Sequence, residues 1–546
     1  MMSAEEDRLS AGAQAKDEEQ GVVNKNTEKL ADEDIPAENV TNEDSPSKQR
    51  IAIILLGLGL SVFLAALDIT IVSTALPEIV AHFKASDSAY SWIASSYLLT
   101  NASSVGLWGR LSDIWGRKPI LSTSIILFLG GSLICGLAIN VSMLIAGRAL
   151  QGIGSGGITV MANICVSDLF DVQRRSAYLG IFGATWAIAG AVGPVIGGAF
   201  TTYVTWRWCF YINLPVGGVA FLFLMFFLKI DTTKKSLIDG LATIDWIGVA
   251  LVIAGTIMLL LGLEFGGDQF SWSSATVICL IVFGVVALII FGIYERFPSS
   301  PIIPLAVFNS WQNIALLLVN FCHGAVFIGG CFYLPVYLQN VLLESSLMSG
   351  VLLLPLVGAL AISSGLAGWY LRSTGRFREV IIFGMFFTTL GYGLYLDLKP
   401  YASWSRIVLY QMIVGLGLGP NFQATLIALQ ANVKTSEMSQ ATAAFSLVRQ
   451  LAASISVVVG TVIYNHEVAV KKARLMAAVG SNLASEIVAA STATAALTRE
   501  LPGDEKQIVF DVITKGLFYV WLLYLCISVL GLALSCTLRN MRKETS

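Results

Sequence analysis

The feature that most constrains this chain is a long series of apolar runs, each close to the length needed to cross a lipid bilayer. A membrane-spanning helix takes about 20 predominantly apolar residues. Runs of that length lie near 51–76, 88–108, 119–139, 142–166, 176–199, 207–228, 243–263 and 274–294. Six more lie near 312–337, 347–369, 379–397, 405–430, 439–464 and 516–538. The sequence therefore predicts an all-α, polytopic protein with about fourteen helices in the lipid bilayer.

The composition agrees with a membrane protein and argues against several other classes. The chain is 55% hydrophobic and 13% charged, and a soluble domain carries about twice that charge. A net charge of −2 provides no attraction to nucleic acid. The cysteines lie in apolar runs without metal-ligand spacing, so we expect no metal site. Because no Walker loop and no catalytic set occur, we also expect no cofactor, no ATP hydrolysis and no enzymatic activity.

The distribution of positive charge predicts the orientation in the membrane. The even-numbered turns carry thirteen cations: Arg110, Arg117, Lys118, Arg174, Arg175, Lys229, Lys234, Lys235, Arg296, Arg372, Arg376, Arg378 and Lys434. The short odd-numbered turns carry four: Lys84, Arg207, Lys399 and Arg406. Under the positive-inside rule both termini are therefore cytoplasmic. Segment 465–515, which has Ala-rich, partly helical stretches and is broken at Pro502-Gly503, is then one long non-cytoplasmic loop.

An internal repeat divides the spans into two blocks. The spacing Gly368-x-x-x-Arg372-x-x-Gly375-Arg376 copies Gly109-x-x-x-Asp113-x-x-Gly116-Arg117, each after the second span of its block. Repeats of this kind predict two bundles with a substrate cavity between them at mid-membrane. The predicted parts are a disordered acidic cytoplasmic tail (1–50), a six-helix N-terminal bundle (51–228), two inserted helices with linkers (229–300), a six-helix C-terminal bundle (301–538) and a short cytoplasmic tail (539–546).

The polar segment between the second and third runs resembles a signature of the major facilitator superfamily. It has the spacing Gly-x-x-x-Asp-x-x-Gly-Arg-Lys, carried by Gly109, Asp113, Gly116, Arg117 and Lys118. The resemblance implies that Asp113 and Arg117 pair across helix ends and hold one conformation closed. The family often has a basic residue where this chain has Ile114, which removes one ion pair. The alternative is an ordinary cytoplasmic turn, because such turns also favour glycines and cations.

Asp68 and Arg148 are charged residues that lie inside predicted spans. A carboxylate in an apolar helix costs about 2.5–3.5 kcal/mol, so Asp68 should face a cavity or a partner. The run Leu67 to Pro77 resembles the first helix of the fourteen-helix drug:proton antiporters, which implies that Asp68 carries the proton. Arg148, followed by Gln151-Gly152, resembles a fourth-helix signature whose Arg takes part in proton transfer. The alternatives are that Asp68 caps a helix break and that Arg148 reaches the nearer membrane surface.

The fifth run contains Gly-Pro midway along its length. A proline there frees a backbone carbonyl and permits a kink, and paired glycines let a neighbouring helix approach closely. The order resembles the signature of antiporters, which implies export. It is carried by Gly190, Gly193, Pro194, Gly197 and Gly198. Plain small-residue packing is the alternative.

Three polar residues are candidates for the wall of the substrate cavity: Gln151, His323 and Gln339. A single histidine in a span is more often a hydrogen-bonded structural residue than a ligand. These assignments are therefore hypotheses.

Taken together, the resemblance implies a proton-coupled antiporter similar to fungal multidrug and toxin efflux pumps. Its expected partners are protons and small, largely apolar organic molecules such as drugs, toxins or secondary metabolites. We expect a monomer in the plasma membrane, with the vacuolar membrane as second choice. One alternative is a proton-coupled importer of the siderophore type on the same fold. The other is a membrane sensor, which would need a long cytoplasmic signalling tail.

Overall fold

Long apolar helices form nearly all of the chain that the computed structural model describes, namely 48–83, 87–230, 236–267, 269–298, 301–303, 305–490, 494–499 and 501–539. A helix satisfies its backbone polar groups internally, which lipid requires because it offers no hydrogen bonds. The predicted tails, 1–50 and 539–546, lie outside the described residues except for 48–50 and 539.

The helices of the first half and of the inserted pair are α2 (Lys48–Phe83), α3 (Asp87–Trp115), α4 (Arg117–Gly136), α5 (Val141–Leu169), α6 (Val172–Tyr203), α7 (Trp208–Tyr211), α8 (Asn213–Phe227), α9 (Leu237–Ala242), α10 (Trp246–Phe265) and α11 (Ala275–Tyr294). The second half contains η1 (Leu305–Phe308), α12 (Trp311–Asn340), α13 (Ser346–Leu352), α14 (Leu354–Thr374), α15 (Phe377–Tyr395), α16 (Trp404–Ala431), η2 (Thr435–Glu437), α17 (Met438–Val470), α18 (Lys472–Val479), α19 (Ser481–Ala490), α20 (Ala495–Arg499) and α21 (Gly503–Cys536).

Within the described residues, thirteen helices are long and apolar enough to cross a membrane. Helix α3 is outside this set although it has 29 residues. It carries several polar residues, among them Asn101 and Ser104, which are buried inside the protein and do not face lipid. With α3 the total equals the fourteen spans predicted from the sequence.

One predicted boundary was wrong. The polar segment 109–118 is not a turn along its length, because α3 continues to Trp115 and α4 begins at Arg117. Only Gly116 breaks the helix, with φ of +94°, a conformation that glycine adopts without steric cost. Segment 465–515, predicted as a long loop with partly helical stretches, contains α18, α19 and α20 in its described residues, and α17 runs to Val470. The break predicted at Pro502 is confirmed, since α21 begins at Gly503.

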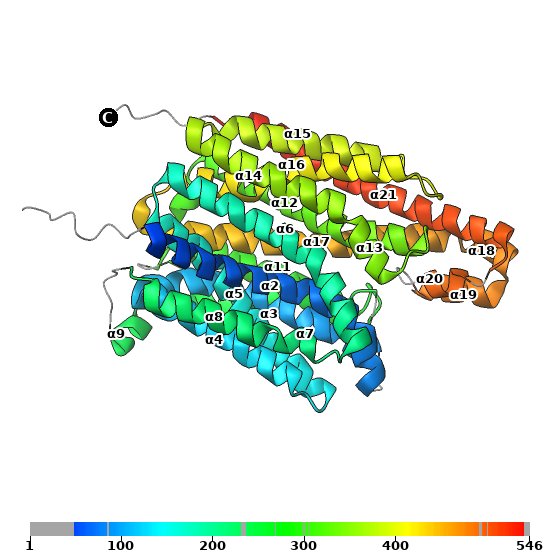
Figure 1. Ribbon diagram of the computed structural model, residues 1–546, viewed down its shortest axis with the longest axis horizontal. Helices are drawn as coiled ribbons and strands as arrows, with labels where there is room; N and C mark the ends of the chain where they lie inside the picture. Colours follow the sequence, from blue (N-terminus) through cyan, green and yellow to red (C-terminus); the bar gives the residue numbers. More distant parts are fainter. Residues whose placement is uncertain are drawn as a thin grey trace, which may run out of the picture. The chain divides into compact units, whose positions relative to one another are not determined.

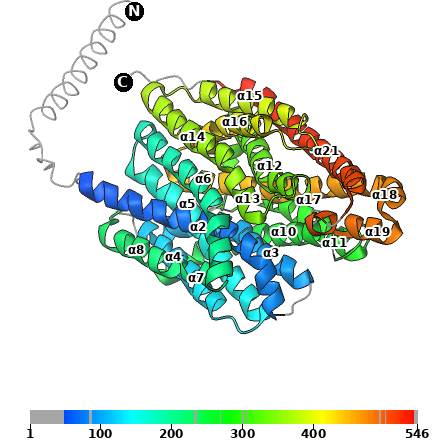
Figure 2. The same cartoon turned by 45° about the vertical axis from the view of Figure 1, so that its right-hand side comes forward.

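Helix contacts form two groups within the residues from Ala52 onward. In the first half α5 packs on α3 and α4, and α4 packs on α8. In the second half α16 packs on α14 and α15, while α21 packs on α12, α15 and α17. The two halves meet along α3 with α17 and along α6 with α14 (Figures 1 and 2). The boundaries proposed for the two bundles at 228 and 301 remain a prediction.

The inserted pair lies against both halves. Helices α10 and α11 pack on each other, and α10 also contacts α3 and α17, one helix from each half. Figure 2 shows α10 and α11 beside α17. At the end of α11, the carboxylate of Glu295 accepts hydrogen bonds from the backbone N–H groups of Ile302 (3.2 Å) and Ile303 (3.4 Å). This carboxylate therefore holds the backbone at 302–303, where the chain passes from α11 into the second half.

Glu295 should make stability depend on pH. The pKa of Glu295 is raised from 4.5 to about 7, mainly by burial and also by nearby Asp245, while the two N–H groups and Arg110 oppose the rise. A raised carboxyl pKa means that the folded state binds the proton more tightly, so the free energy of unfolding falls as pH rises from about 4.5 to 7. The loss is at most about 3 kcal/mol. Glu295→Gln should flatten this slope in detergent melting curves, and exposed Glu379→Gln should not. Parallel curves for wild type and Glu295→Gln would contradict the assignment.

Candidate functional site

The carboxylate of Asp68 lies in a closed polar cluster inside the first half. Asp68 is fully buried in α2, and its Oδ2 accepts from Arg148 Nη1 of α5 in an ion pair. Its Oδ1 accepts from Gln151 Nε2 (3.0 Å) and from Asn213 Nδ2 (2.9 Å). Three helices, α2, α5 and α8, thus meet at one carboxylate.

Further contacts hold the partners of Asp68 in place. Ser132 Oγ of α4 accepts from Gln151 Nε2 (2.7 Å) and from Asn213 Nδ2 (3.2 Å). Arg148 donates Nε to the Ile93 carbonyl (3.2 Å) and lies 4.3 Å from the centre of the Tyr97 ring. Because the guanidinium is paired, hydrogen-bonded and covered by an aromatic ring, it satisfies the usual conditions for a charge inside a membrane.

The structure brings Asp68 and Arg148 together, and it argues against both alternatives for them. Helix α2 continues without interruption through Asp68, so this residue caps no break. Arg148 is 2% exposed and does not reach the membrane surface. Gln151, predicted to line a substrate cavity, is fully buried and donates a hydrogen bond to the Asp68 carboxylate. Asn213 and Ser132 were missed. The available signal for Asn213 was a polar amide two residues before Pro215, near the start of an apolar run.

This cluster can couple a proton to conformation. Protonating Asp68 would remove the counter-charge of Arg148, and an unpaired buried cation is strongly unfavourable. The proton can therefore bind only if the pair separates or becomes hydrated. A change in helix arrangement that opens the cluster would supply that condition, which links proton binding to a change between two states.

A second polar cluster joins the two halves at the end that the cation count predicts to be cytoplasmic. Asp113, in the last turn of α3, pairs with Arg117 Nη1 at 2.5 Å. Both carboxylate oxygens of Asp113 also accept from Ser439 Oγ of α17, at 2.7 and 2.6 Å. Arg117 Nε pairs with Asp168 at the end of α5, at 2.6 Å. The predicted Asp113–Arg117 pair is present, and Ser439 extends it to the second half.

The other residues of this signature have clear local roles. Gly109 lies against α17: an added Cβ would be 3.0 Å from the Ser439 carbonyl oxygen, so glycine permits the close approach. Ile114 is 2% exposed and contacts α9 near Gly240, which accounts for an apolar residue at that position. Lys118 makes no ion pair with the described residues.

More hydrogen bonds close the same end of the interface. Arg175 Nη1 of α6 donates to Gln430 Oε1 of α16 (3.1 Å), and Ser167 of α5 donates to the same oxygen (3.0 Å). Ser176 Oγ donates to the Gly368 carbonyl (3.2 Å) on α14. The second copy of the repeat differs, because among the described residues Arg376 forms an ion pair only with exposed Glu379 in the first turn of α15, at 3.4 Å.

The Gly-Pro segment of α6 approaches α2 beside Asp68. A Cβ added to Gly193 would overlap Thr70 Oγ1 and would lie 3.1 Å from the Ile71 backbone nitrogen. Pro194 contacts Gly350 of α13 in the other half, where an added Cβ would be 3.2 Å from its ring. Gly190 and Gly198 have open space at their Cα, and Gly197 is buried. The close approach expected for the glycine pair 197–198 is therefore made at Gly193 and not at Gly198.

Gly193→Ala should strongly impair the protein, whereas Gly198→Ala should be tolerated. The methyl group added at position 193 would overlap Thr70, and overpacking of this kind costs about 1–3 kcal/mol. The same methyl group at position 198 meets no atom within 4 Å. The melting temperature of each purified variant in detergent is the measurement. Equal behaviour of the two alanine variants would rule out a packing role for Gly193.

The candidates in the second half lie apart from the Asp68 cluster. His323 is fully buried in α12 and contacts the Leu418 carbonyl through Nε2 (3.0 Å) and Arg449 Nη2 through Nδ1 (3.1 Å). Gln339 lies half-buried near the end of the same helix. One residue along from Arg449, Gln450 Nε2 donates to Asn101 Oδ1 of α3 (2.5 Å), which joins the halves at a second level.

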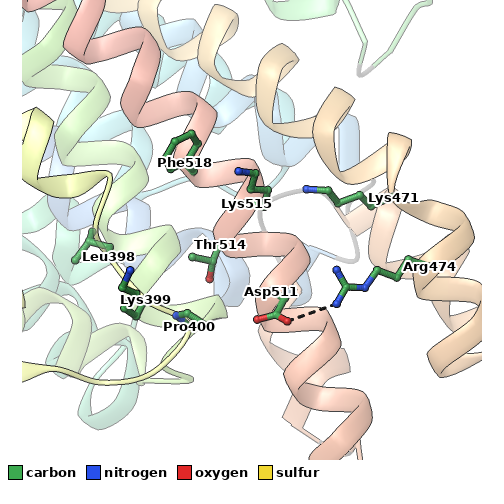
Figure 3. A pocket seen from close by; sticks show the side chains of 9 residues that line it. All are labelled: Leu398, Lys399, Pro400, Lys471, Arg474, Asp511, Thr514, Lys515 and Phe518. Atoms are coloured by element: carbon green, nitrogen blue, oxygen red, sulfur yellow. Dashed lines mark ion pairs between the residues drawn. The ribbon is translucent and has the colours of Figure 1, made fainter.

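A hollow of about 460 Å³ lies at the predicted outer end, between the α15–α16 turn, the end of α17 and α21 (Figure 3). It is lined by Leu398, Lys399, Pro400, Lys471, Arg474, Asp511, Thr514, Lys515 and Phe518. None of Gln151, His323 and Gln339 lines it, so it is not the cavity predicted at mid-membrane. Among the described residues no group of three His, Cys, Asp or Glu side chains could hold a metal ion.

Comparisons with known proteins agree with this architecture. The family model described as Major Facilitator Superfamily matches residues 58–244 and 240–457. The protein named efflux pump dotC of Dothistroma septosporum is 45% identical over 492 residues, covering 90% of this chain and 84% of its own. The MFS-type transporter ppz2 of Metarhizium majus is 41% identical over 502 residues, covering 92% of this chain and 86% of its own.

A solved structure shares the fold. It is a bacterial homologue of the human lysosomal transporter Spinster in an inward-facing, unoccupied conformation. It matches with a TM-score of 0.56 at 15% identity and covers 90% of this chain and 98% of that chain. At this identity the similarity concerns the fold alone.

Proposed function

The chain belongs to the major facilitator superfamily and is an efflux transporter, and we propose that inward movement of protons drives its export of small, largely apolar organic molecules. The substrate binds between the two halves, which expose it alternately to the two sides of the membrane. The proposed working unit is a monomer in the lipid bilayer.

The observation that carries proton coupling is the buried pair of Asp68 and Arg148. Their charges are removed from water, and their hydrogen bonds come from three different helices of the first half. A pair of this kind is costly to place in a membrane, so a functional role is the default explanation. Asp68 is proposed to take up and release the proton, and Arg148 to hold the carboxylate ionised until the helices move.

The contacts of Asp113 provide the second element that the proposal requires. Alternating access needs an equilibrium between two arrangements of the halves, and contacts present in only one arrangement bias that equilibrium. Asp113, Ser439 and Gln430 take part in contacts between the halves at the predicted cytoplasmic end. They are proposed to hold this end closed while the other end opens.

Metabolite profiling of cells with and without the gene tests the proposal. The exported compounds should accumulate inside deletion cells and decrease in their medium. A protonophore should reduce export by wild-type cells to the deletion level, because it removes the proton gradient. Export that continues under the protonophore would contradict proton coupling, and a compound depleted inside deletion cells would indicate the importer alternative.

The orientation supports a separate prediction. The location is proposed as the plasma membrane, with the vacuolar membrane as second choice. An epitope tag at either terminus should react with antibody only after permeabilisation, whereas a tag inserted at Gly503 should react on intact cells. If all three tags react on the same side, the number of spans is wrong by one.

A further inference from the structure

The guanidinium of Arg449, which is partly exposed, is a second cation inside an apolar run, and it lies on α17 of the C-terminal half. Its carbon is 4.6 Å from the ring centre of Phe422 and 5.3 Å from that of Phe445. Nη2 donates to the Phe422 carbonyl (3.1 Å) and contacts His323 Nδ1 (3.1 Å). Gly324 of α12 leaves the space, since a Cβ there would be 3.3 Å from Arg449 Cγ.

The hydrogen bonds of His323 determine its protonation. Nε2 faces the Leu418 carbonyl oxygen, which can only accept, so the ring proton is on Nε2. Nδ1 faces an Arg N–H, which can only donate, so Nδ1 is the acceptor and the imidazole is neutral. The pair of Arg449 and His323 therefore carries one positive charge.

No carboxylate balances that charge. Arg449 forms no ion pair with the described residues, and the apolar runs 312–337, 347–369, 405–430 and 439–464 contain no Asp or Glu. Arg148 in the first half, in contrast, has Asp68. An unpaired charge inside a membrane marks a site where a ligand or a substrate supplies the missing partner.

The guanidinium also has donors to offer. Both of its hydrogen bonds use Nη2, so Nε and Nη1 remain for another acceptor. Arg449 is partly exposed, while His323 beneath it is fully buried. Its neighbour Gln450 contacts α3 of the other half, so the free donors lie next to the surface along which the two halves must separate during transport.

We propose that Arg449 binds the anionic group of the substrate, and that the exported molecules are therefore aromatic organic anions such as carboxylates or acidic phenols. This inference rests on the proposed transport function and specifies its substrate class. A guanidinium binds a carboxylate through two parallel N–H···O bonds. The rings of Phe422 and Phe445 beside it, with Phe327 against Phe422, would pack against an aromatic body. His323 positions Arg449 and does not itself need to touch the substrate.

Binding of two matched probes to the purified full-length protein in nanodiscs tests the proposal. 2-Naphthoate and 2-naphthamide have the same ring system and nearly the same size, but only naphthoate is charged. Wild-type protein should bind naphthoate at least tenfold more tightly than naphthamide in equilibrium dialysis. Arg449→Gln should weaken naphthoate binding at least tenfold and leave naphthamide binding unchanged within twofold. Arg449→Lys should retain part of the preference, because it keeps the charge without the planar pair of donors.

Arg376→Gln is the matched control, since Arg376 is 61% exposed at a helix end, and it should bind both probes as the wild type does. The proposal is overturned if Arg449→Gln keeps the affinity for naphthoate, or if it loses both probes equally. If that variant does not fold, the wild type decides, because equal or absent binding of the two probes overturns the proposal. Dialysis uses no proton gradient. Charge-selective binding together with protonophore-resistant export would therefore reject proton coupling and retain the anion site.

Discussion

Replacing Asp68 by Asn should abolish uphill, proton-driven export and leave substrate binding in place. Asn has nearly the size of Asp and keeps one acceptor oxygen, but it cannot carry a negative charge or release a proton. If Asp68 carries the proton, export can then no longer draw on the gradient. Downhill movement of substrate can continue, because it needs only the change between the two states.

Asp68→Asn should also destabilise the fold, and this effect must be separated from the effect on coupling. All three partners of Asp68 are donors, namely Arg148, Gln151 and Asn213, so an amide N–H₂ would face at least one of them. Arg148 would also lose its counter-charge. Removing one partner of a buried ion pair costs about 3–5 kcal/mol.

The double variant Asp68→Asn with Arg148→Gln provides the control. It contains no buried charge at this site, so it should recover much of the melting temperature lost by Asp68→Asn. It should still fail to export uphill, because no carboxylate is present. Export is measured in vesicles at matched protein abundance, with and without an imposed pH gradient, for the compound that profiling identifies. An Asp68→Asn protein that still pumps uphill at a rate that follows the gradient would remove Asp68 from the proton pathway.

The sequence was sufficient to find the charged members of this site, because a charge in an apolar run requires an explanation. Asp68 and Arg148 were identified on that ground, whereas the pair of Asp113 and Arg117 was expected from the resemblance of the polar segment 109–118 to a family signature. Neutral partners carry no such signal. Asn213 could be a helix start and Ser132 a small packing residue, and only the folded arrangement places both beside Asp68. Ser439 is 326 positions from Asp113, so their contact depends on how α3 and α17 pack.

The fold was predictable to a similar extent. Apolar runs locate the helices, but their ends depend on contacts that hydropathy does not describe. Helix α3 continues through Asp113 because Arg117, Ser439 and Asp168 satisfy the charges there. The run 347–369 is divided into α13 and α14, with Pro355 near the start of α14. The two apolar runs within 229–300 were recognisable as inserted helices. The contacts of α10 with both α3 and α17 could not be predicted from the sequence.

Asp113→Asn should slow transport without preventing membrane insertion or substrate binding. The variant keeps a side chain of the same size but loses the charge that strengthens its bonds to Arg117 and Ser439. Hydrogen bonds to charged groups contribute about 1.5–3 kcal/mol. The side chains of Asp113 and Arg117 are 19% and 12% exposed, so a loss of about 1–2 kcal/mol is expected. That loss would shift the balance between the closed and open forms of this end about 5- to 30-fold towards the open form.

A double-mutant cycle with Ser439→Ala identifies the path of this effect. If Asp113 closes the interface through Ser439, the double variant should be no slower than Asp113→Asn alone, because the shared bonds have already been lost. If Asp113 only stabilises the first half through Arg117, the two losses should add. Arg117 keeps its pair with Asp168 in each variant, so the end of α3 should stay folded, which melting curves can verify. Unchanged turnover of Asp113→Asn at matched abundance would reject the gating role, because a contact that biases the transport equilibrium cannot be weakened without changing the rate at which the two forms exchange.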